Sequence, residues 1–392
     1  MKIVLNEYTD YCAIGHSDTV RDVLSFHQSL PGYRCTPLWR ADAIAREIGV
    51  RHLSVKDEGA RFGIKAFKVL GASYAVYHLL KKKSGGTVTP SDFFTEGGRY
   101  WARGMTFTCA TDGNHGRAVA WVARHLGRPA FVYMPKGSVP ARVRAIEQEG
   151  AAVTVIDRGY DDAVRIAADA ATREGWTVIA DVGYPGYTEI PLFIQEGYQT
   201  IFAECSEQLE KSGVPEPDCV LIQAGVGAFA AAAANFFSQR GSATRLVSVE
   251  PDAVACLLHS MAVNDGEPHG VPPGGETIMA GLNCETPSTT AWPLIHSRFD
   301  AFMTIDDADA EEAMRLLARE GIVAGESGAA SLGGLLALRR ETTESVKEKL
   351  GLHPEASVLI VNTEADTDPQ GYRRIVGFPA GQVVSRRAAC VL

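Results

Sequence analysis

Short apolar segments alternate with amphipathic segments along most of this 392-residue chain. Between residues 106 and 181, segments of strand length alternate with segments whose apolar residues recur at helical spacing. The predicted strands are 106–110, 130–134, 153–156 and 178–181, and the predicted helices between them are 116–126, 140–150 and 161–175. Repeated strand–helix units form a parallel sheet that helices cover. The chain is therefore expected to adopt an α/β fold.

A second series of the same kind follows a predicted helix at 191–212. Its predicted strands are 219–223, 246–250 and 357–361, and its predicted helices are 229–240, 308–321 and 329–341. Two such series indicate two open parallel-sheet domains, and the length of the chain also favours two or three packed units. We expect a smaller, mobile domain at 86–184 and a larger domain built from 1–85 and 185–392. A cleft between them is the expected place for an active site.

Three segments fall outside this alternation. Residues 1–50 are predicted to form an irregular arm with short helices at 17–28 and 41–49. Residues 84–104 are rich in Gly, Ser and Thr without a clear period, which favours a surface insertion at a domain boundary. The tail after Pro379 is expected to be loosely ordered.

Lys68 is placed where a reactive amine is expected. A strand-like segment at 52–55 leads through a polar turn into a helix that begins near Ala66. The positive end of the helix dipole and the apolar neighbours both disfavour an ammonium, so the amine is expected to lose its proton easily. Such an amine acts as a nucleophile or a base, and it can bind an aldehyde as a Schiff base. A surface lysine that opens an amphipathic helix explains the same stretch.

Two turns carry polar or glycine-rich sequence between a strand and a helix. The turn at 223–229 contains a Gly-x-Gly pattern, whose free backbone N–H groups suit a phosphate, although tight strand-to-helix packing also explains it. No third glycine follows at the dinucleotide spacing, so a single phosphate fits better than a nicotinamide dinucleotide. The turn at 110–116 collects a hydroxyl, a carboxylate, an amide and an imidazole, more than a helix cap needs.

Composition excludes several classes of function. The net charge of -9 leaves no basic surface for nucleic acid, and no segment is long and apolar enough to span a membrane. The first residues lack the pattern of a signal peptide, so we expect a cytoplasmic protein whose eight cysteines are thiols. No Cys-x-x-Cys pair is present, and we expect no metal site. Cys256 and Cys284 bracket a loop, and the sequence is compatible with either two separate thiols or a disulfide between them.

The lysine, the Thr-Asp-Gly-Asn-His-Gly turn and the glycine turn follow one another in a specific order. In this order the chain resembles the fold-type II pyridoxal-phosphate enzymes, the tryptophan synthase β-like family. Serine and threonine dehydratases of that family usually carry two serines where this chain has Thr111 and Asp112. With its other matching segments the chain is similar to the diaminopropionate ammonia-lyases; these segments are 61–63, 67–71, 120–121, 133–138, 160–162, 186–188, 277–284, 325–329 and 363–368. Pro185 and Ala365 depart from that pattern and leave the substrate scope open.

The resemblance implies a role for each matching residue. Lys68 would bind pyridoxal 5'-phosphate as a Schiff base, Asn114 would contact the ring hydroxyl, and Thr363 would face the pyridine nitrogen. The phosphate would lie in the large domain, against Gly225, Val226, Gly227 and Ala228. The substrate would lie against a set of loop residues that comprises Thr111, Asp112, Gly113, His115 and Asp181.

The resemblance also implies a reaction, the elimination of ammonia from 2,3-diaminopropionate to give pyruvate and ammonia. Lys68 and Asp112 would take the α-proton from opposite faces, so that both the D and L forms react, and Asp181 would bind the β-ammonium. We expect a homodimer. The alternatives are a dehydratase-like or β-replacing enzyme that acts on serine, threonine or another β-substituted amino acid, and a non-catalytic protein that binds pyridoxal phosphate.

Overall fold

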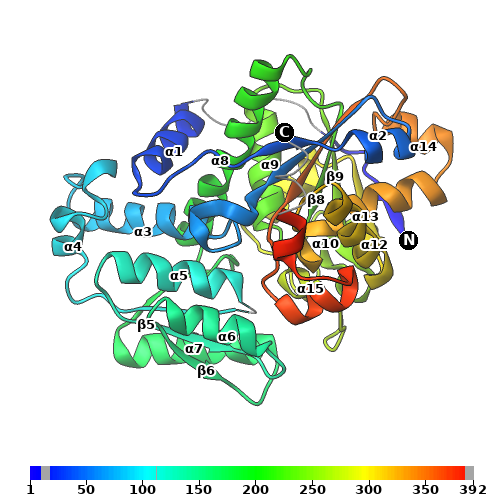
Figure 1. Cartoon of the computed structure of the whole chain (residues 1–392). Helices are drawn as coiled ribbons and strands as arrows, with labels where there is room; N and C mark the ends of the chain where they lie inside the picture. The colour runs from blue at the N-terminus through cyan, green and yellow to red at the C-terminus, as the bar shows by residue number, and fades with distance from the viewer. Residues whose placement is uncertain (10–17, 112, 385–392) are drawn as a thin grey trace.

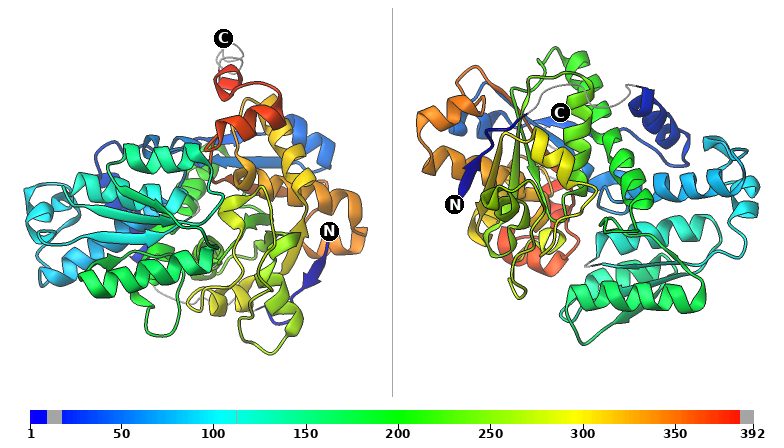
Figure 2. Two further views of the ribbon diagram at one scale, coloured as in Figure 1. Left: turned by 90° about the horizontal axis from the view of Figure 1, so that it is seen from below. Right: turned by 180° about the vertical axis from the view of Figure 1, so that it is seen from behind.

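The strands of the protein form two sheets in two lobes that lie side by side (Figure 1). The computed structural model describes residues 1–9, 18–111 and 113–384. One sheet has seven strands and the other has four. The views of Figure 2 show the same two lobes from below and from behind. The prediction of an α/β fold with two parallel sheets is confirmed.

The larger sheet is parallel in its centre and antiparallel at both edges. Its strands lie in the order β1 (Ile3–Leu5), β10 (Ala301–Ile305), β9 (Arg245–Pro251), β8 (Cys219–Gln223), β11 (Ser357–Asn362), β3 (His52–Asp57) and β2 (Leu38–Arg40). Only the edge strands β1 and β2 pair in the antiparallel sense. Antiparallel edge strands are common on parallel sheets of this size. The carboxyl ends of the five central strands therefore share one edge of the sheet.

Both faces of the larger sheet are buried. In β11, Val358 and Ile360 belong to one apolar core, whereas Leu359 and Val361 belong to the other. The first core contains residues of α2 (Asp42–Ile48), α12 (Asp307–Arg319), α13 (Glu326–Glu341), α14 (Glu344–Lys349) and α15 (Pro369–Val376). The second contains residues of α1 (Asp18–Ser29), α3 (Val69–Lys83), α8 (Glu189–Ser212), α9 (Ala228–Gln239), α10 (Cys256–Val263) and α11 (Trp292–Arg298). Burial on both faces explains why the central strands are continuous apolar runs.

The smaller sheet is parallel throughout. Its order is β6 (Ala152–Val155), β5 (Ala130–Met134), β4 (Phe107–Ala110) and β7 (Thr177–Val178). The connecting helices are α5 (Asn114–His125), α6 (Pro140–Gln148) and α7 (Tyr160–Glu174). Helix α3 packs against both α5 and α8, so it joins the two lobes. The predicted domain limits at residues 86 and 184 stay a prediction.

Residues 84–104 are mostly exposed, as predicted for a surface segment, but a few of them anchor the segment in the core. It contains the short helix α4 (Glu96–Trp101), and Phe93 and Val88 are buried in the same apolar core as α3 and α5. Apolar residues that are spaced irregularly along the chain do not show such anchoring through periodicity. The predicted tail after Pro379 lies mostly outside the described residues, which end at 384.

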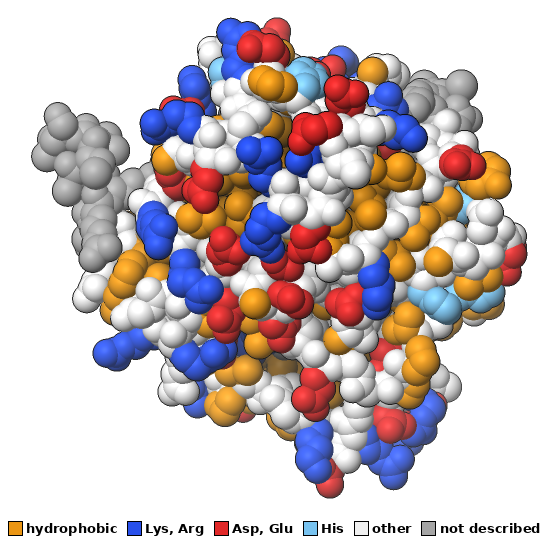
Figure 3. Space-filling view, turned by 90° about the vertical axis from the view of Figure 1, so that its right-hand side faces the viewer, with side chains coloured by type: hydrophobic (Ala, Val, Ile, Leu, Met, Phe, Trp, Pro, Cys, Tyr) orange, Lys and Arg blue, Asp and Glu red, His pale blue; other side chains and the backbone are white. Residues whose placement is uncertain are grey.

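Charges of both signs are intermingled on the face shown in Figure 3, with apolar side chains between them. Among the described residues, no helix combines the length and the apolar character that crossing a membrane requires.

Candidate active site

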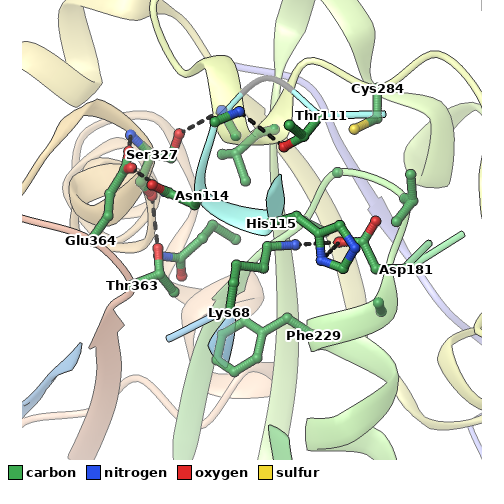
Figure 4. A pocket seen from close by; sticks show the side chains of 18 of the residues that line it. Lys68, Thr111, Asn114, His115, Asp181, Phe229, Cys284, Ser327, Thr363 and Glu364 are labelled. Atoms are coloured by element: carbon green, nitrogen blue, oxygen red, sulfur yellow. Dashed lines mark hydrogen bonds and ion pairs between the residues drawn. The ribbon is translucent and has the colours of Figure 1, made fainter. Parts of the chain in front are cut away.

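One pocket lies where the carboxyl ends of strands from the two sheets face each other. Residues that follow β4, β7, β8 and β11 line it, together with the two residues just before α3 and the first residues of α9. Every predicted site residue that the structure describes lines this pocket: Lys68, Thr111, Gly113, Asn114, His115, Asp181, Gly225, Val226, Gly227, Ala228 and Thr363. Asp112, the remaining one, lies outside the described residues. Figure 4 shows these side chains converging from both lobes.

Lys68 and Asp181 form an ion pair across the pocket. The Lys68 Nζ donates to the Asp181 Oδ2 at 2.5 Å, and Lys68 is the residue just before α3 (Figure 4). Burial is the largest single cause and lowers the pKa of Lys68, but the causes that raise it, led by the negative charge of Asp181, together outweigh burial, so the net pKa lies above its usual value. Our prediction that the helix dipole and burial would favour the neutral amine is wrong for this arrangement. Asp181 is distant from Lys68 in the sequence, and its carboxylate reverses the expected direction of the pKa shift of Lys68.

Asp181 lies three residues beyond the end of β7, and Tyr187 holds the segment between them in place. The Tyr187 hydroxyl donates to the Val178 carbonyl at 2.9 Å and accepts from the Ala180 N–H at 3.0 Å. Burial raises the pKa of Asp181, but the causes that lower it, led by the positive charge of Lys68, together outweigh burial, so the carboxylate stays ionised. The pocket therefore contains a fixed negative charge that Lys68 balances.

His115 is a neutral neighbour of this carboxylate. Its Nε2 bonds the Ile179 carbonyl at 2.7 Å, so Nε2 carries the hydrogen and Nδ1 carries the lone pair. The Nδ1 atom lies 3.8 Å from the Asp181 Oδ2. Burial is the largest cause that lowers the pKa of His115. In this tautomer His115 offers an acceptor to the pocket, not a charge.

The turn between β4 and α5 has its own internal bonds. The Thr111 Oγ1 accepts from the N–H groups of Gly113 at 2.9 Å and Gly116 at 3.1 Å. Gly113 has a φ of 152°, and a Cβ there would meet the Arg142 side chain at 2.8 Å. The close approach of Arg142 therefore requires glycine at this position.

The turn between β8 and α9 has the shape of an anion cradle. Gly227 has a φ of 96°, and a Cβ at Gly225 would lie 2.9 Å from the Cys284 Sγ. The first N–H groups of α9 have no partner within the helix and face the pocket with the positive end of the helix dipole. This arrangement fits a phosphate, and a side chain at either glycine would clash with neighbouring atoms and distort the turn.

Thr363 presents a hydroxyl at the end of β11. The Gln223 Nε2 donates to the Thr363 Oγ1 at 2.9 Å, and it also donates to the Val361 carbonyl at 2.9 Å. Within the described part of the chain, no acceptor takes the Thr363 hydroxyl hydrogen, so that hydrogen is available to a ring nitrogen. Sequence reasoning chose Thr363 but did not find Gln223, which orients it.

Glu364 is a second residue that sequence reasoning did not assign. The Asn114 Nδ2 donates to the Glu364 Oε2 at 2.5 Å, and the Ser327 N–H donates to the other carboxylate oxygen at 3.3 Å (Figure 4). Glu364 thus connects the Asn114 loop of the smaller lobe to the start of α13 in the larger lobe. Its position directly after Thr363 was the available signal, since a polar pair after a buried strand marks the edge of the sheet where sites form.

Cys256 and Cys284 are free thiols in the structure. The Cys256 thiol lies 3.7 Å from the Gly225 carbonyl oxygen, whereas Cys284 is part of the pocket lining. Of the two arrangements that the sequence left open, the structure has separate thiols.

Comparison with known proteins places the chain in a family. The family model of pyridoxal-phosphate dependent enzymes matches residues 30–363. A diaminopropionate ammonia-lyase of Salmonella typhimurium is 39% identical over 375 residues, which cover 93% of this chain and 92% of the relative. The Escherichia coli diaminopropionate ammonia-lyase is 42% identical over 361 residues, which cover 90% and 89% of the two chains.

Solved structures agree with the sequence comparison. The crystal structure of the Escherichia coli enzyme in complex with an aminoacrylate-PLP azomethine reaction intermediate has a TM-score of 0.87 and 38% identity, and 96% of each chain is covered. A threonine deaminase from Solanum lycopersicum has a TM-score of 0.72 at 19% identity, which shows a shared fold alone. The cradle, the lysine and the hydroxyl in the pocket fit pyridoxal phosphate, the cofactor that the resemblance predicted. The chain belongs to the diaminopropionate ammonia-lyase family of pyridoxal-phosphate-dependent enzymes.

Proposed function

We propose that this enzyme eliminates ammonia from 2,3-diaminopropionate. One molecule of substrate and one of water give one pyruvate and two molecules of ammonia, because the aminoacrylate product of elimination hydrolyses without further help. The observation that carries the proposal is the Asp181 carboxylate, which is ionised, buried in the pocket and balanced by an amine. A substrate that brings a second ammonium can take the place of that amine.

The cofactor contacts are proposed from the geometry of the pocket. Lys68 would hold pyridoxal phosphate, Asn114 would contact its ring hydroxyl, the turn at Gly225–Ala228 would hold its phosphate and Thr363 would face its ring nitrogen. When bound, this cofactor withdraws electrons from the substrate α-carbon and makes the α-proton acidic. Thr363 is a neutral partner, and unlike a carboxylate it does not force a proton onto the ring nitrogen. That property suits elimination better than transamination.

The leaving group is the part of the substrate that Asp181 would recognise. An amine leaves a carbon atom readily only when it is protonated, and a nearby carboxylate favours the protonated form. Asp181 is buried with its carboxylate in the pocket, where water screens a charge–charge contact poorly. We therefore assign Asp181 to the β-ammonium and, on the same grounds, Thr111, Gly113 and His115 to the walls around the substrate.

Two residues would take the α-proton, one on each face. Lys68 would act on one face and Asp112, which lies outside the described residues, on the other, so that both enantiomers react. Asp112→Asn keeps the shape of the side chain and removes the base. Turnover of D-diaminopropionate should fall by roughly 10²–10⁴-fold, and turnover of the L form much less, as single-turnover assays of each enantiomer would measure. Equal losses on both enantiomers would assign Asp112 to binding or loop shape.

A dehydratase-like activity has less support. An L-threonine dehydratase of Mycobacterium leprae is 29% identical but covers only 58% of this chain. The two departures from the ammonia-lyase pattern lie outside the pocket lining: Pro185 is exposed in the turn before α8, and Ala365 packs against Gly59. Neither one therefore gives a reason to expect serine or threonine as the substrate.

The proposal also includes a mobile domain, a location in the cytoplasm and a homodimer. Residues 86–184 would be the mobile domain, because the smaller sheet lies wholly within them and closes one side of the pocket. Six free cysteines among the described residues suit a reducing cytoplasm. A homodimer is proposed from the resemblance to fold-type II enzymes, and size-exclusion chromatography with light scattering would test it.

A screen of pyruvate release tests the function directly. The purified enzyme with pyridoxal phosphate would be assayed on both enantiomers of diaminopropionate, on serine, on threonine and on β-chloroalanine. The proposal expects diaminopropionate to have the highest kcat/KM among the natural amino acids in this set. An enzyme that prefers serine or threonine over both diaminopropionate enantiomers would contradict it.

A further inference from the structure

Tyr198 is a buried tyrosine beside Lys68 whose hydroxyl is unused. The residue lies on α8 and is fully buried, and its hydroxyl has no hydrogen-bond partner among the described residues. Buried polar groups are nearly always paired, so each exception calls for an explanation. Sequence patterns give this residue no role, and it does not belong to the pocket lining.

The ring of Tyr198 lies next to the amine of Lys68. The Lys68 Nζ is 5.8 Å from the centroid of the Tyr198 ring, and the Phe67 ring packs against the same tyrosine with centroids 4.6 Å apart. Burial raises the pKa of Tyr198 far above its usual value, so the group is a neutral phenol. The positive charge of Lys68, which lies 5.8 Å from the ring centroid, opposes that rise.

Two glycines make this closeness possible. A Cβ at Gly71 of α3 would meet the Tyr198 Cε1 at 2.6 Å, and a Cβ at Gly197 of α8 would meet the Leu70 carbonyl oxygen at 2.6 Å. Glycine is unfavourable inside a helix, yet Gly197 lies in the interior of α8, and Gly71 lies in the first turn of α3. The two helices therefore cross where only hydrogen atoms fit between them, and the crossing sets the tyrosine ring against the base of the Lys68 helix.

The ion pair cannot persist while the substrate is bound in the proposed way. The Asp181 Oδ2 is occupied by the Lys68 Nζ at 2.5 Å, and a substrate ammonium at Asp181 would displace that amine. A displaced amine in a buried pocket needs another polar partner. The free hydroxyl of Tyr198 is next to it.

We propose that Tyr198 is a positioning residue for Lys68: its hydroxyl holds the Lys68 amine whenever Asp181 holds the ammonium of the substrate. The role of Asp181 in this statement rests on the proposed function, but the contact between Tyr198 and Lys68 can be tested without turnover. Tyr198→Phe is the test variant, because it keeps the ring in the space at Gly71 and removes only the hydroxyl. Tyr372→Phe on α15 is the matched control, since Tyr372 is also buried with an unpartnered hydroxyl and lies outside the pocket lining.

The first measurement uses the cofactor-free chain. Asp181→Asn removes the competing carboxylate, and the rate at which acetic anhydride modifies Lys68 is followed by mass spectrometry as a function of pH. A hydroxyl that accepts from the ammonium stabilises the charged form, so adding Tyr198→Phe should raise the acetylation rate at fixed pH by roughly tenfold. Adding Tyr372→Phe should leave the rate unchanged. Equal rates with and without the Tyr198 hydroxyl would overturn the proposal, whatever the enzyme turns over.

The second measurement separates positioning from general structure. Lys68 becomes a free amine when the substrate replaces it on the cofactor; without Tyr198 that amine would return to Asp181 and compete with the substrate ammonium, so the KM of Tyr198→Phe for diaminopropionate should rise by roughly tenfold. β-Chloroalanine has no β-ammonium, and its KM should change little. Equal changes in KM for both substrates, or no change for either, would overturn the proposal. Failure of the wild-type enzyme to use diaminopropionate would instead refute the proposed function and leave the acetylation result to decide on Tyr198.

Discussion

Two groups of buried charges in this protein are satisfied in different ways. In the first, Lys68 and Asp181 are held chiefly by each other, and their side chains are still 19% and 10% exposed. In the second, Arg61, Glu58, Glu204 and Lys56 are at most 2% exposed and share several hydrogen bonds each. The first group lies in the pocket and the second lies away from it. The comparison indicates that a buried ion pair whose partner a substrate would replace has few other hydrogen bonds.

In the second group the charged side chains have several hydrogen bonds, so a ligand could not easily replace one partner. Arg61 donates to both oxygens of Glu58, to both oxygens of Glu204 and to the Arg34 carbonyl. Lys56 donates to Glu204 at 2.6 Å and to the Thr36 carbonyl at 2.9 Å. This network, the Arg61 network, fixes the segment that leads to Lys68 and ties it to α8. Its role is structural, whereas the role of the Lys68 pair is chemical.

The largest expected effect is on turnover. Lys68→Ala should abolish elimination from every substrate while the fold survives, because no other amine in the pocket lining can hold the cofactor. Pyruvate release and far-UV circular dichroism would be measured on the same sample. A variant that keeps the borohydride-trappable yellow species at the wild-type level would contradict the assignment of Lys68.

The next largest effect is on stability. Glu204→Ala leaves Arg61 and Lys56 buried without their shared carboxylate, and such a break typically destabilises by about 3–5 kcal/mol. Urea denaturation would measure the free energy of unfolding. A loss below about 1 kcal/mol would mean that the Arg61 network contributes no more to stability than a surface ion pair does. That result would contradict the distinction between the two groups of charges.

Asp181→Asn should destabilise less than Glu204→Ala does. Lys68 is partly exposed and can release its proton when its partner is lost, so the expected loss is below about 2 kcal/mol. The same urea titration would show it. A loss as large as that of Glu204→Ala would indicate that the pocket pair is structural too.

The smallest expected effect is on pH dependence. Burial raises the pKa of Glu204, but Arg61 and Lys56 lower it more, from its usual 4.5 to about 2. Because the folded pKa is the lower one, the stabilisation is complete above pH 4.5 and is lost as the pH falls towards 2. The difference in unfolding free energy between the wild type and Glu204→Gln should therefore be smaller at pH 3 than at pH 6. An equal difference at both pH values would show that Glu204 acts through packing alone.

Patterns along the chain predict the central strands well and the edges poorly. The buried strands β5 and β8 were predicted residue for residue, since continuous apolar runs bounded by turns leave little choice. The edge strands β1 and β2 were not predicted: they have three residues each and are recognised by the strands that they pair with. The central strand β10 was missed as well, although it is a continuous buried run. Short edge strands depend on tertiary pairing, which local sequence does not record.

The site was predicted through its turns and missed where contacts are tertiary. Lys68, Asn114 and Thr363 follow strand ends or open helices, which sequence shows. In the sequence pattern Tyr198 is indistinguishable from the other apolar residues of a long helix. Only the crossing of α3 and α8 brings it to Lys68. The raised pKa of Lys68 was missed for the same reason, because Asp181 is distant in sequence.

We propose that Asp181 selects an ammonium as the leaving group. The most direct test is the ratio of kcat/KM for diaminopropionate to kcat/KM for β-chloroalanine, measured for the wild type and for Asp181→Asn. Both reactions share the cofactor, the lysine and the α-proton, so the ratio isolates the leaving group. We expect the ratio to fall by at least roughly tenfold in Asp181→Asn, the size of one charge-assisted contact. An unchanged ratio, with both substrates losing equally, would contradict it.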